Sequence, residues 1–503
     1  MKMKQTLNIV HEHKMTYDGN SGLFSIMGRL PMDLSSLKVS VHLIAPPKKK
    51  QRLKLDLYDY NQIQKHCLSL SEKEDFNPVE LEKDLIALTD LLEAHREAIF
   101  DQEYSSQIKK VYKISITKEK EAIALLSQKN LLNNLGRMLG ESGIVGEVKN
   151  RLLLFIVAIS YKTKYPLHAL VNSSSGSGKS HLINAIADCL PAEEVISFSR
   201  VTSKSFYHYR KGELENKLVL IQDFDGLDEE ALYALRELQS LGSLSSSITY
   251  KDKFGNLTSK TQTVEAHFSS MGATTKRIYT DNESRSILLK VDESIEQTAR
   301  IIAFQNEVNQ GLIDTAEIKK AKLELSNLVR MLKDVKIVNP YAGRINLPLE
   351  AKMLRRLNKQ FQDFVCLIAF IHQYQRKSDS EGRVIATKED VKSAIDLFFD
   401  SIWLKVDELE GSLRGFYEDL KTYLLERDKQ KDRTNKSFTQ REIRQGLNLS
   451  KSHCHRQLKQ LLAYEYITIV KGSLNKGYQY KISWWDSFEQ SRDQIKSNLL
   501  SQL

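Results

Sequence analysis

One stretch of the sequence combines glycine, hydroxyl and amine groups at a spacing suited to binding phosphate. The run NSSSGSGKS, residues 172–180, follows a short apolar segment at 167–171 and leads into an amphipathic segment at 181–189. Glycines in such a run let successive backbone N–H groups point at phosphate oxygens, and the N-terminus of the helix that follows attracts negative charge. The order of strand, Gly/Ser loop, Gly-Lys-Ser and helix is that of a phosphate-binding loop, or P-loop.

Each residue type in this loop has an expected task. We expect Lys179 to reach the β- and γ-phosphates of ATP and the Ser180 hydroxyl to help bind Mg²⁺. One position departs from the usual motif, because Ser173 stands where glycine is most common. The alternative is a serine- and glycine-rich loop without a ligand. The predicted ATP-binding residues are Ser175, Gly176, Ser177, Gly178, Lys179, Ser180 and His181.

A second chemical feature is an apolar run, 218–221, that ends in acidic residues about forty positions later. One carboxylate at such a strand end can hold Mg²⁺, and a second can polarise the attacking water. Asp223 is the predicted metal ligand, together with Ser180. Polarising the water falls to Asp225 or to Gln222, the amide counterpart of a general-base glutamate. If it falls to Gln222, the chain binds ATP but hydrolyses it slowly. The alternative is a solvated acidic turn.

The next segment predicts a β-hairpin followed by a core strand. Runs rich in β-formers at 244–250 and 257–264 flank a turn at 251–256 with glycine near its tip. The apolar run 266–271 comes directly afterwards and ends in the polar Gly-Ala-Thr-Thr of 272–275. A polar side chain at this strand end would contact the γ-phosphate or the water. Thr274 is the predicted sensor, and Ser270 is the competitor.

Several arginines follow this strand. Arg285 comes just before the apolar run 287–291, where an arginine finger would project into the site of a neighbouring subunit; a surface arginine is the alternative. Arg344, Arg355 and Arg356 could supply a second sensor, and Arg356 is favoured among them.

In their order, these motifs resemble AAA+ ATPases with a pre-sensor-1 hairpin, which include helicases of the minichromosome-maintenance type. The stretches IQDFDG (221–226), LRELQS (235–240), GATT (272–275) and VDES (291–294) are similar to the helicase half of primase–helicase proteins of bacterial mobile elements. LKLDLY (53–58) and IHQYQR (371–376) resemble flanking regions of those proteins, so the likeness covers most of 20–485.

The resemblance implies a ring, expected to be a homo-hexamer, in which ATP lies between subunits and hairpins line a central channel. Lys251 and Lys253 would then follow the backbone of single-stranded DNA; without the resemblance they are exposed lysines of a turn. Two features depart from the family. The zinc-binding cysteines and acidic residues of the primase are absent, so a separate primase or replication partner is expected. Gln222 occupies a position more often filled by Glu, which leaves open whether it is native or a substitution that impairs hydrolysis.

The elements that must position these residues follow from the pattern of apolar residues. Segments at 23–26, 38–43 and 53–57 predict strands, and 81–100 predicts a helix, which gives an α+β N-terminal domain. Alternation of apolar strands and amphipathic helices over 120–335 is typical of an α/β fold with a parallel sheet. The predicted organisation is an N-terminal accessory domain (1–120), an AAA+ core of the α/β P-loop class (121–340), a helical lid and linker (341–428), a winged helix-turn-helix (429–485) and a tail (486–503).

The C-terminal region predicts two helices and a two-stranded wing. Thr439 and Glu442 have the spacing of a capping box; a helix to 447, a second at 451–465 and strands at 466–471 and 478–482 complete a winged helix-turn-helix, whose second helix usually enters a major groove. A protein-docking module is the alternative. The predicted DNA contacts are Lys451, Ser452, His455, Arg456 and Lys459 on the second helix, and Lys471 and Lys476 on the wing.

Composition bounds these interpretations. The 503 residues carry a net charge of +10, and residues 429–481 alone contain 12 basic and 3 acidic residues, so the basic character lies largely in this module. No signal-peptide pattern, no apolar run long enough for a membrane span and no pair of cysteines at zinc-ligand spacing is found. We therefore expect a cytoplasmic protein without membrane contact.

These observations together predict an ATP-dependent DNA translocase or helicase of a bacterial mobile genetic element that acts in replication. The first alternative is an ATP-switched DNA-loading or transposition-regulator ATPase. The second is an ATP-binding DNA adaptor that does not hydrolyse ATP.

Overall fold

The chain divides into two compact units, Met1–Lys113 and Ile114–Leu503, each with its own hydrophobic core. In the part of the chain that the structure describes, no helix combines the length and apolar composition needed to cross a bilayer. This computed structural model describes residues 6–11, 13–31, 36–45, 50–74, 76–107, 114–202, 205–209, 212–251, 257–275, 284–409, 411–429, 432–433, 436–473, 477–485 and 488–503.

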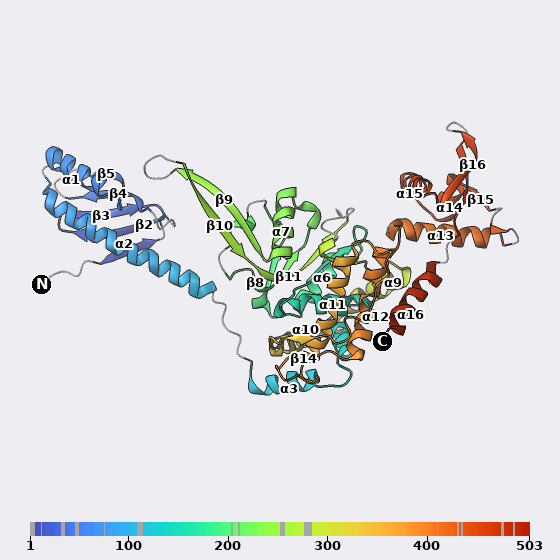
Figure 1. The fold of residues 1–503 in the computed structure, drawn as a ribbon. Coiled ribbons are helices and arrows are strands. Elements are labelled where there is room, and N and C mark those ends of the chain that lie inside the picture. The colour runs from blue at the N-terminus through green and yellow to red at the C-terminus, as the bar shows by residue number, and fades with distance from the viewer. Residues whose placement is uncertain are drawn as a thin grey trace. The chain divides into compact units, whose positions relative to one another are not determined.

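Unit 1 is an antiparallel sheet with two helices packed on one face (Figure 1). Successive side chains alternate between buried and exposed along the strands, as a sheet covered on one side requires. The apolar stripe Leu81, Leu85, Leu88 and Leu92 of the long helix packs against the inward side chains. The elements are β1 (Leu7–His11), β2 (Lys14–Gly19), β3 (Gly22–Met27), β4 (Lys38–Ile44), β5 (Gln51–Asp56), α1 (Tyr60–Glu74) and α2 (Pro78–Gln107).

The sequence pattern found only part of this unit. The three strands and the helix predicted from it correspond to β3, β4, β5 and the central part of α2. β1 and β2 went unpredicted, because β2 buries only Met15 and Tyr17, too short an alternation to stand out. α1 went unpredicted since only Ile63, Cys67 and Leu70 face the core along its length.

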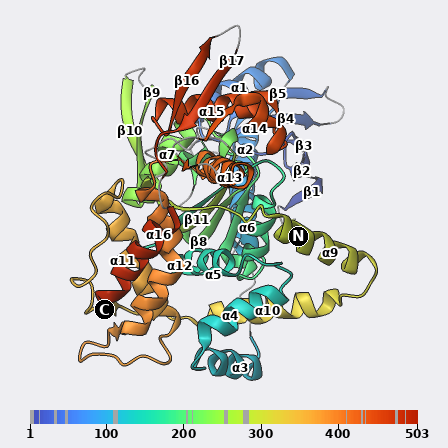
Figure 2. The same ribbon diagram turned by 90° about the vertical axis from the view of Figure 1, so that its right-hand side faces the viewer.

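The core of unit 2 is a five-stranded parallel sheet in the order β12-β6-β11-β8-β7. Helices α5 and α6 pack on it (Figure 2). The apolar run 152–159 forms most of α5 and is buried throughout, because α5 also contacts α4, α11 and α12. The strands and helices of this core are β6 (His168–Asn172), α6 (Lys179–Ala187), β7 (Val195–Phe198), β8 (Glu215–Ile221), α7 (Glu229–Leu241), β11 (His267–Thr274), β12 (Ile287–Leu289) and α5 (Val148–Ala158).

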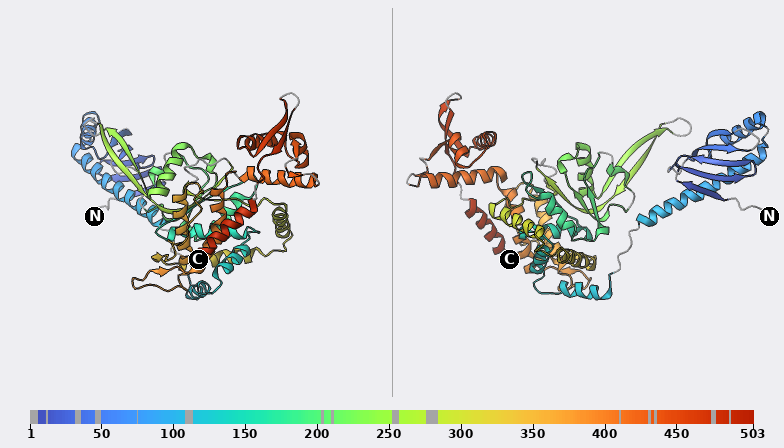
Figure 3. Two further views of the ribbon diagram at one scale, coloured as in Figure 1. Left: turned by 45° about the vertical axis from the view of Figure 1, so that its right-hand side comes forward. Right: turned by 180° about the vertical axis from the view of Figure 1, so that it is seen from behind.

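A β-hairpin, β9 (Ser243–Lys251) and β10 (Leu257–Glu265), is inserted between α7 and β11 and extends as a two-stranded ribbon (Figures 1 and 3). Its predicted position directly before the core strand is confirmed. Short 3₁₀ helices complete the connections: η1 (Ile159–Lys162), η2 (Ala192–Glu194), η3 (Ser205–His208) and η4 (Phe224–Gly226).

Further helices come before and after the sheet along the chain. The C-terminal helix α16 returns to α12, where Lys496 pairs with Asp396 at 2.7 Å and Arg492 pairs with Asp400. The elements are α3 (Ile116–Leu126), α4 (Leu131–Glu141), α9 (Ile295–Asn309), α10 (Thr315–Met331), β13 (Ile337–Val338), α11 (Leu354–Ile371), β14 (Val384–Ile385), α12 (Lys388–Val406) and α16 (Phe488–Ser501).

The segment before α16 has a separate hydrophobic cluster and a three-stranded sheet in the order β15-β17-β16. The predicted capping box of Thr439 and Glu442 is confirmed, since each side chain accepts a hydrogen bond from the other residue's backbone N–H. The elements are α13 (Gly411–Arg427), β15 (Ser437–Thr439), α14 (Gln440–Gly446), α15 (Lys451–Ala463), β16 (Ile467–Ser473) and β17 (Gly477–Ile482).

Candidate nucleotide-binding site

The glycine-containing loop lies between the end of β6 and the start of α6. Gly176 and Gly178 have φ values of +81° and +92°, a left-handed backbone that side chains other than glycine rarely adopt. A Cβ at either position would meet open space, so the backbone conformation rather than crowding calls for glycine. Gly178 is also the N-cap of α6. The backbone N–H groups that open this helix are therefore available to an anion.

The serine at the first position of the motif has a structural task. The Ser173 hydroxyl accepts a hydrogen bond from the Val291 backbone N–H at 3.0 Å, a contact that glycine could not make. Next to it, the backbone N–H and hydroxyl of Ser174 donate to the two carboxylate oxygens of Glu293 at 2.9 and 2.6 Å. Glu293 therefore holds the loop from the segment after β12. This contact was not predicted from the sequence, because 119 residues separate the partners.

Lys179 is buried, with 7% of its surface exposed, and its ammonium lies over the loop. Nζ donates to the carbonyl oxygens of Ser173 at 2.9 Å and Ser174 at 2.5 Å. Across the residues that the structure describes, it pairs with no carboxylate. A buried cation that is met only by neutral carbonyls is costly. Binding a phosphate would supply the missing negative charge, so the loop fits a nucleotide.

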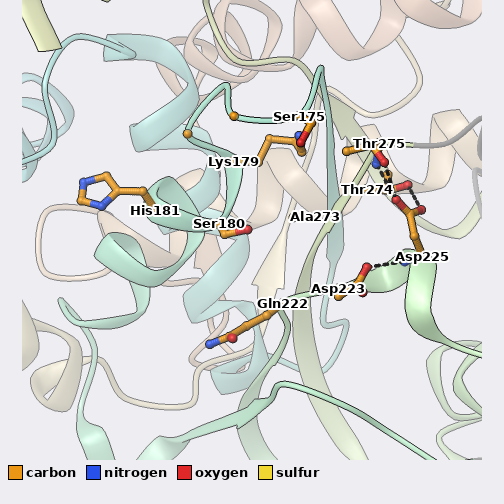
Figure 4. A pocket seen from close by; sticks show the side chains of 12 residues that line it. Ser175, Lys179, Ser180, His181, Gln222, Asp223, Asp225, Ala273, Thr274 and Thr275 are labelled. Atoms are coloured by element: carbon orange, nitrogen blue, oxygen red, sulfur yellow. Dashed lines mark hydrogen bonds between the residues drawn. The ribbon is translucent and has the colours of Figure 1, made fainter. Parts of the chain in front are cut away.

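A cavity of about 490 Å³ opens beside the loop, and the carboxyl ends of β8 and β11 complete its wall (Figure 4). Because β11 lies between β6 and β8, these strand ends meet at the same edge of the sheet. The cavity brings together most of the predicted ATP-site residues and adds Ala273 and Thr275; Ser177, Arg285 and Arg356 do not line it. Its lining consists of Ser175, Gly176, Gly178, Lys179, Ser180, His181, Gln222, Asp223, Asp225, Ala273, Thr274 and Thr275.

The acidic and sensor residues are directly bonded. Thr274 Oγ1 donates to Asp225 Oδ1 at 2.5 Å, and the backbone N–H and hydroxyl of Thr275 donate to Asp225 Oδ2, both at 2.8 Å. Asp223 caps η4 by accepting from the Asp225 backbone N–H at 3.1 Å. The Asp225 carboxylate is therefore oriented by the end of β11, while the exposed Asp223 faces the cavity.

Two glycines permit this arrangement. A Cβ on Gly226 would lie 2.8 Å from Asp223 Oδ2. A Cβ on Gly272 would lie 2.9 Å from Leu170 Cδ2 and 3.1 Å from Phe224 Cδ2. The approaches of 2.8 and 2.9 Å are closer than real Cβ atoms show. At Gly226 the exposed Asp223 side chain could move away, whereas at Gly272 the buried Leu170 and, from the acidic turn, Phe224 pack directly against β11.

Gln222 and His181 turn away from the acidic pair. The Gln222 side-chain amide donates to Ser197 Oγ on β7 at 3.3 Å, and both side chains point away from Asp225 and Thr274 (Figure 4). In this conformation the Gln222 amide, although it lines the cavity, is bonded to β7 rather than to the acidic turn.

The competing sensor residue Ser270 lies elsewhere. It pairs in register with His168 at the start of β6, whereas Thr274 pairs with Asn172 at the end of that strand. The Ser270 hydroxyl is buried, 3.0 Å from His168 Nδ1 and within 3.1 Å of the donor Gln239 Nε2. Burial lowers the pKa of His168 to about 4, so this imidazole is neutral.

The two predicted arginines bond outside the cavity. Arg285 Nε donates to Ser240 Oγ at the end of α7, at 2.7 Å. Arg356, in the first turn of α11, donates to the hydroxyl of Ser284, and Gln360 Nε2 donates to the Ser284 carbonyl at 3.3 Å. Ser284, which directly precedes Arg285, is thus bonded to two residues of α11.

A second, larger hollow of about 880 Å³ lies in the C-terminal segment between α14, α15 and the strands β16 and β17. Lys451, His455 and Lys459 line it from one face of α15. Ser452 and Arg456, which were predicted as contacts on the same helix, do not line it, because the helical phase directs them elsewhere. The lining cations are Lys451 and Lys459 of α15, Lys471 of β16, and Arg441 and Arg444 of α14, which the sequence analysis did not select.

Three predicted DNA contacts remain. Lys251 is the last residue of β9. Lys253 and Lys476 lie outside the described residues.

Comparison with known families agrees with this geometry. No curated protein matches the chain. Residues 115–334 match the family model described as the MTBMA_p00010 P-loop domain, a range that includes the loop, both strand ends and the β9–β10 hairpin. The match and the five-stranded parallel sheet with its packed helices identify this part of the chain as the α/β core of a P-loop NTPase.

Proposed function

We propose that the chain is an AAA+ ATPase of the pre-sensor-1 hairpin type that moves along or unwinds DNA, in the replication of a bacterial mobile genetic element. The observation that carries this proposal is the position of the β9–β10 hairpin. It leads directly into β11, the strand whose far end holds Thr274 beside the ATP site. A change at the phosphate end of β11 therefore has a short covalent route to the hairpin.

The root of the hairpin is fixed to the same hydrophobic cluster as the acidic strand. Leu244 and Val264, one from each hairpin strand, are buried with Ile221, the last residue of β8. Hydrogen bonds secure the exit from the hairpin, since the Ala266 N–H donates to the Gly242 carbonyl at 2.8 Å and the His267 N–H to the Leu214 carbonyl at 3.0 Å. A rigid root lets the ribbon act as a lever, and Lys251 and Lys253 would contact DNA phosphates.

ATP would be held by the loop and the first turn of α6, with Lys179 neutralising phosphate charge and Ser180 and Asp223 holding Mg²⁺. The metal supplies electrostatic stabilisation of the charge that develops on the phosphates. Asp225 and Thr274 form one hydrogen-bonded unit at the end of β11, and this unit orients the attacking water.

The arginines support an assembly in which ATP lies between subunits. Arg285 bonds to Ser240 rather than to its own cavity, and a residue in this place can reach the site of the next copy in a ring, here proposed as a homo-hexamer. The helices α11 and α12 form the lid, and Arg356 of α11 contacts Ser284. A shift of the lid would therefore move the segment that carries Arg285.

The C-terminal segment is proposed to be a winged helix that binds duplex DNA. The described residues that line its groove include five cations and no carboxylate, which suits a polyanion. DNA held there would keep the ring on its template while the hairpins engage one strand in the channel. A separate primase would be the replication partner.

The geometry of Gln222 favours one alternative, an ATP-binding DNA adaptor that does not hydrolyse ATP. Its amide donates to Ser197, and an amide cannot accept a proton from water at neutral pH. Steady-state ATP hydrolysis with and without single-stranded DNA separates the two proposals, measured on the parent chain and on Gln222→Glu. DNA-stimulated turnover in either protein supports the motor. ATP binding without turnover in both supports the adaptor.

A further inference from the structure

The open face of the sheet in unit 1 carries cations that neither the ATP site nor the C-terminal groove uses. Helices α1 and α2 cover the opposite face, where Tyr17, Phe24 and Val41 are buried. Exposed basic side chains on the open face are Lys38 of β4 and Arg52 and Lys54 of β5. The strand register aligns Lys14, Met27, Ser40 and Lys54 in one row across the sheet, and Thr16, Ser25, His42 and Arg52 in the next.

A hollow of about 440 Å³ lies where the first of these rows meets the ends of the strands. Arg29, Lys38 and Lys54 line it, with Ser40 between them and one carboxylate, Asp56. This volume falls in the range that accommodates a nucleotide-sized group.

The single carboxylate of the hollow is engaged by the chain itself. Asp56 Oδ1 accepts hydrogen bonds from the backbone N–H groups of Leu37 at 2.9 Å and Tyr58 at 3.1 Å. Lys38 and Lys54 form no ion pair with any residue that the structure describes. Burial and, after it, the neighbouring cations Lys50 and Arg52 lower the pKa of His42 on this face. In the two aligned rows an anionic ligand would therefore meet cations and no acid; Asp18, opposite Leu23, is an exposed acid of the row beyond them.

We propose that this face binds the backbone of single-stranded nucleic acid. Apolar side chains on the same face favour a single strand over a duplex. Met27 is 40% exposed in the row of Lys14 and Lys54, and Leu23 is 39% exposed opposite Asp18 in the row beyond Arg52. In a duplex the bases are stacked inside and only phosphates are presented, whereas a single strand offers phosphates and unstacked bases to one surface. Cations and exposed apolar side chains together match the single strand.

This site gives residues 1–113 a function that goes beyond ATP-driven movement and the duplex-binding groove. It needs neither ATP nor the ring, since every contributing residue lies within the compact unit Met1–Lys113. A strand held here would be presented to the motor before or after passage through the channel.

The test compares two triple variants of the full chain that lose the same charge. The first, Lys38→Gln, Arg52→Gln and Lys54→Gln, alters the open face. The second, Lys65→Gln, Lys73→Gln and Lys83→Gln, alters exposed lysines on α1 and α2. Fluorescence anisotropy with a labelled oligothymidylate and with a labelled duplex, each over a range of salt concentrations without ATP, gives affinities and salt slopes. Equal melting temperatures establish that both variants are folded.

Each phosphate contact to a single strand contributes about 0.7 to the slope of log affinity against log salt. With three cations removed, the open-face variant should therefore bind the oligothymidylate more weakly, and its slope of log affinity against log salt should fall by about 2. The helix-face variant should bind the oligothymidylate like the parent. Duplex binding should stay unchanged in both variants. The proposal is overturned if both triple variants weaken equally, if the open-face variant binds the oligothymidylate like the parent, or if the duplex is weakened as much as the single strand. Loss of ATP hydrolysis has no bearing on these outcomes, so the motor proposal can fail independently.

Discussion

The Thr274 hydroxyl donates a hydrogen bond to the Asp225 carboxylate at 2.5 Å, which joins the end of β11 to the acidic turn after β8. This bond lies at the cavity wall that faces the P-loop. The bond connects β11 directly to Asp225, the carboxylate that would respond to the phosphates of ATP. The β9–β10 hairpin shares this connection because it leads into β11.

Replacing Thr274 by valine keeps the shape of the side chain but removes this donor. A hydrogen bond to a charged group contributes about 1.5–3 kcal/mol, so we expect kcat for ATP to fall about tenfold or more while the Kd for ATP changes little. The measurement is steady-state hydrolysis together with equilibrium ATP binding, in whichever of the parent and Gln222→Glu turns over faster. Ser270→Ala is the control, because the Ser270 hydroxyl lies beside His168 at the start of β6, whereas Thr274 pairs with Asn172 at the end of that strand. Equal kcat values for the two variants would contradict the assignment.

The close contact at Gly272 predicts a loss of stability on substitution. A Cβ there would lie 2.9 Å from Leu170 Cδ2 and 3.1 Å from Phe224 Cδ2, and overpacking of this kind costs about 1–3 kcal/mol. Gly272→Ala should therefore lower the melting temperature of unit 2. Gly136→Ala is the matched control, since its Cβ would meet open space within α4 and alanine favours a helix. A melting temperature that is unchanged by Gly272→Ala would show that the acidic turn does not pack as described.

His168 predicts a specific acid sensitivity. Burial lowers its pKa from 6.5 to about 4, so between these pH values the unfolded chain binds more protons than the folded chain, and stability falls as the pH falls through that window. The full effect is about 3 kcal/mol. Urea unfolding midpoints of the parent should decrease from pH 6.5 toward pH 4 by more than those of His168→Asn. Parallel pH profiles would mean that His168 is not buried in its neutral form.

The C-terminal groove predicts that two cations on the same helix differ in their effect on duplex binding. Lys459 lines the groove and Arg456 does not. Each phosphate contact to a duplex contributes about 0.9 to the salt slope, so Lys459→Gln should reduce the slope by about 1 and Arg456→Gln should leave it unchanged. Anisotropy with a labelled duplex over a range of salt concentrations measures both slopes. A larger effect of Arg456→Gln would assign DNA to the opposite face of α15.

Local sequence was sufficient for the P-loop, because the strand, glycines, lysine and helix are contiguous and each residue type has one physical task. It was also sufficient for the capping box at Thr439 and for the hairpin before β11. For residues that are distant in the chain, the sequence predicted that some belong to the same site but not which of them bond to one another. The bond between Thr274 and Asp225 and the contact between Ser174 and Glu293 depend on the order of strands in the sheet, which residue types alone do not determine.

The predicted DNA contacts of α15 were chosen by chemical type and therefore lie on different sides of the helix. Lys451, His455 and Lys459 line the groove, whereas Ser452 and Arg456 do not. The open face of unit 1 was missed because β2, which supplies part of it, has too few buried residues to produce a readable alternation.

The most direct measurement of the central proposal is strand separation on a forked duplex, with the parent chain, Gln222→Glu and Lys179→Ala. The account predicts that the parent or Gln222→Glu separates the strands only when ATP is present, and that Lys179→Ala does not, because the buried ammonium that would meet the phosphates is gone. The account would be contradicted if Lys179→Ala separated the strands as fast as the protein that carries Lys179. It would also be contradicted if neither the parent nor Gln222→Glu separated the strands.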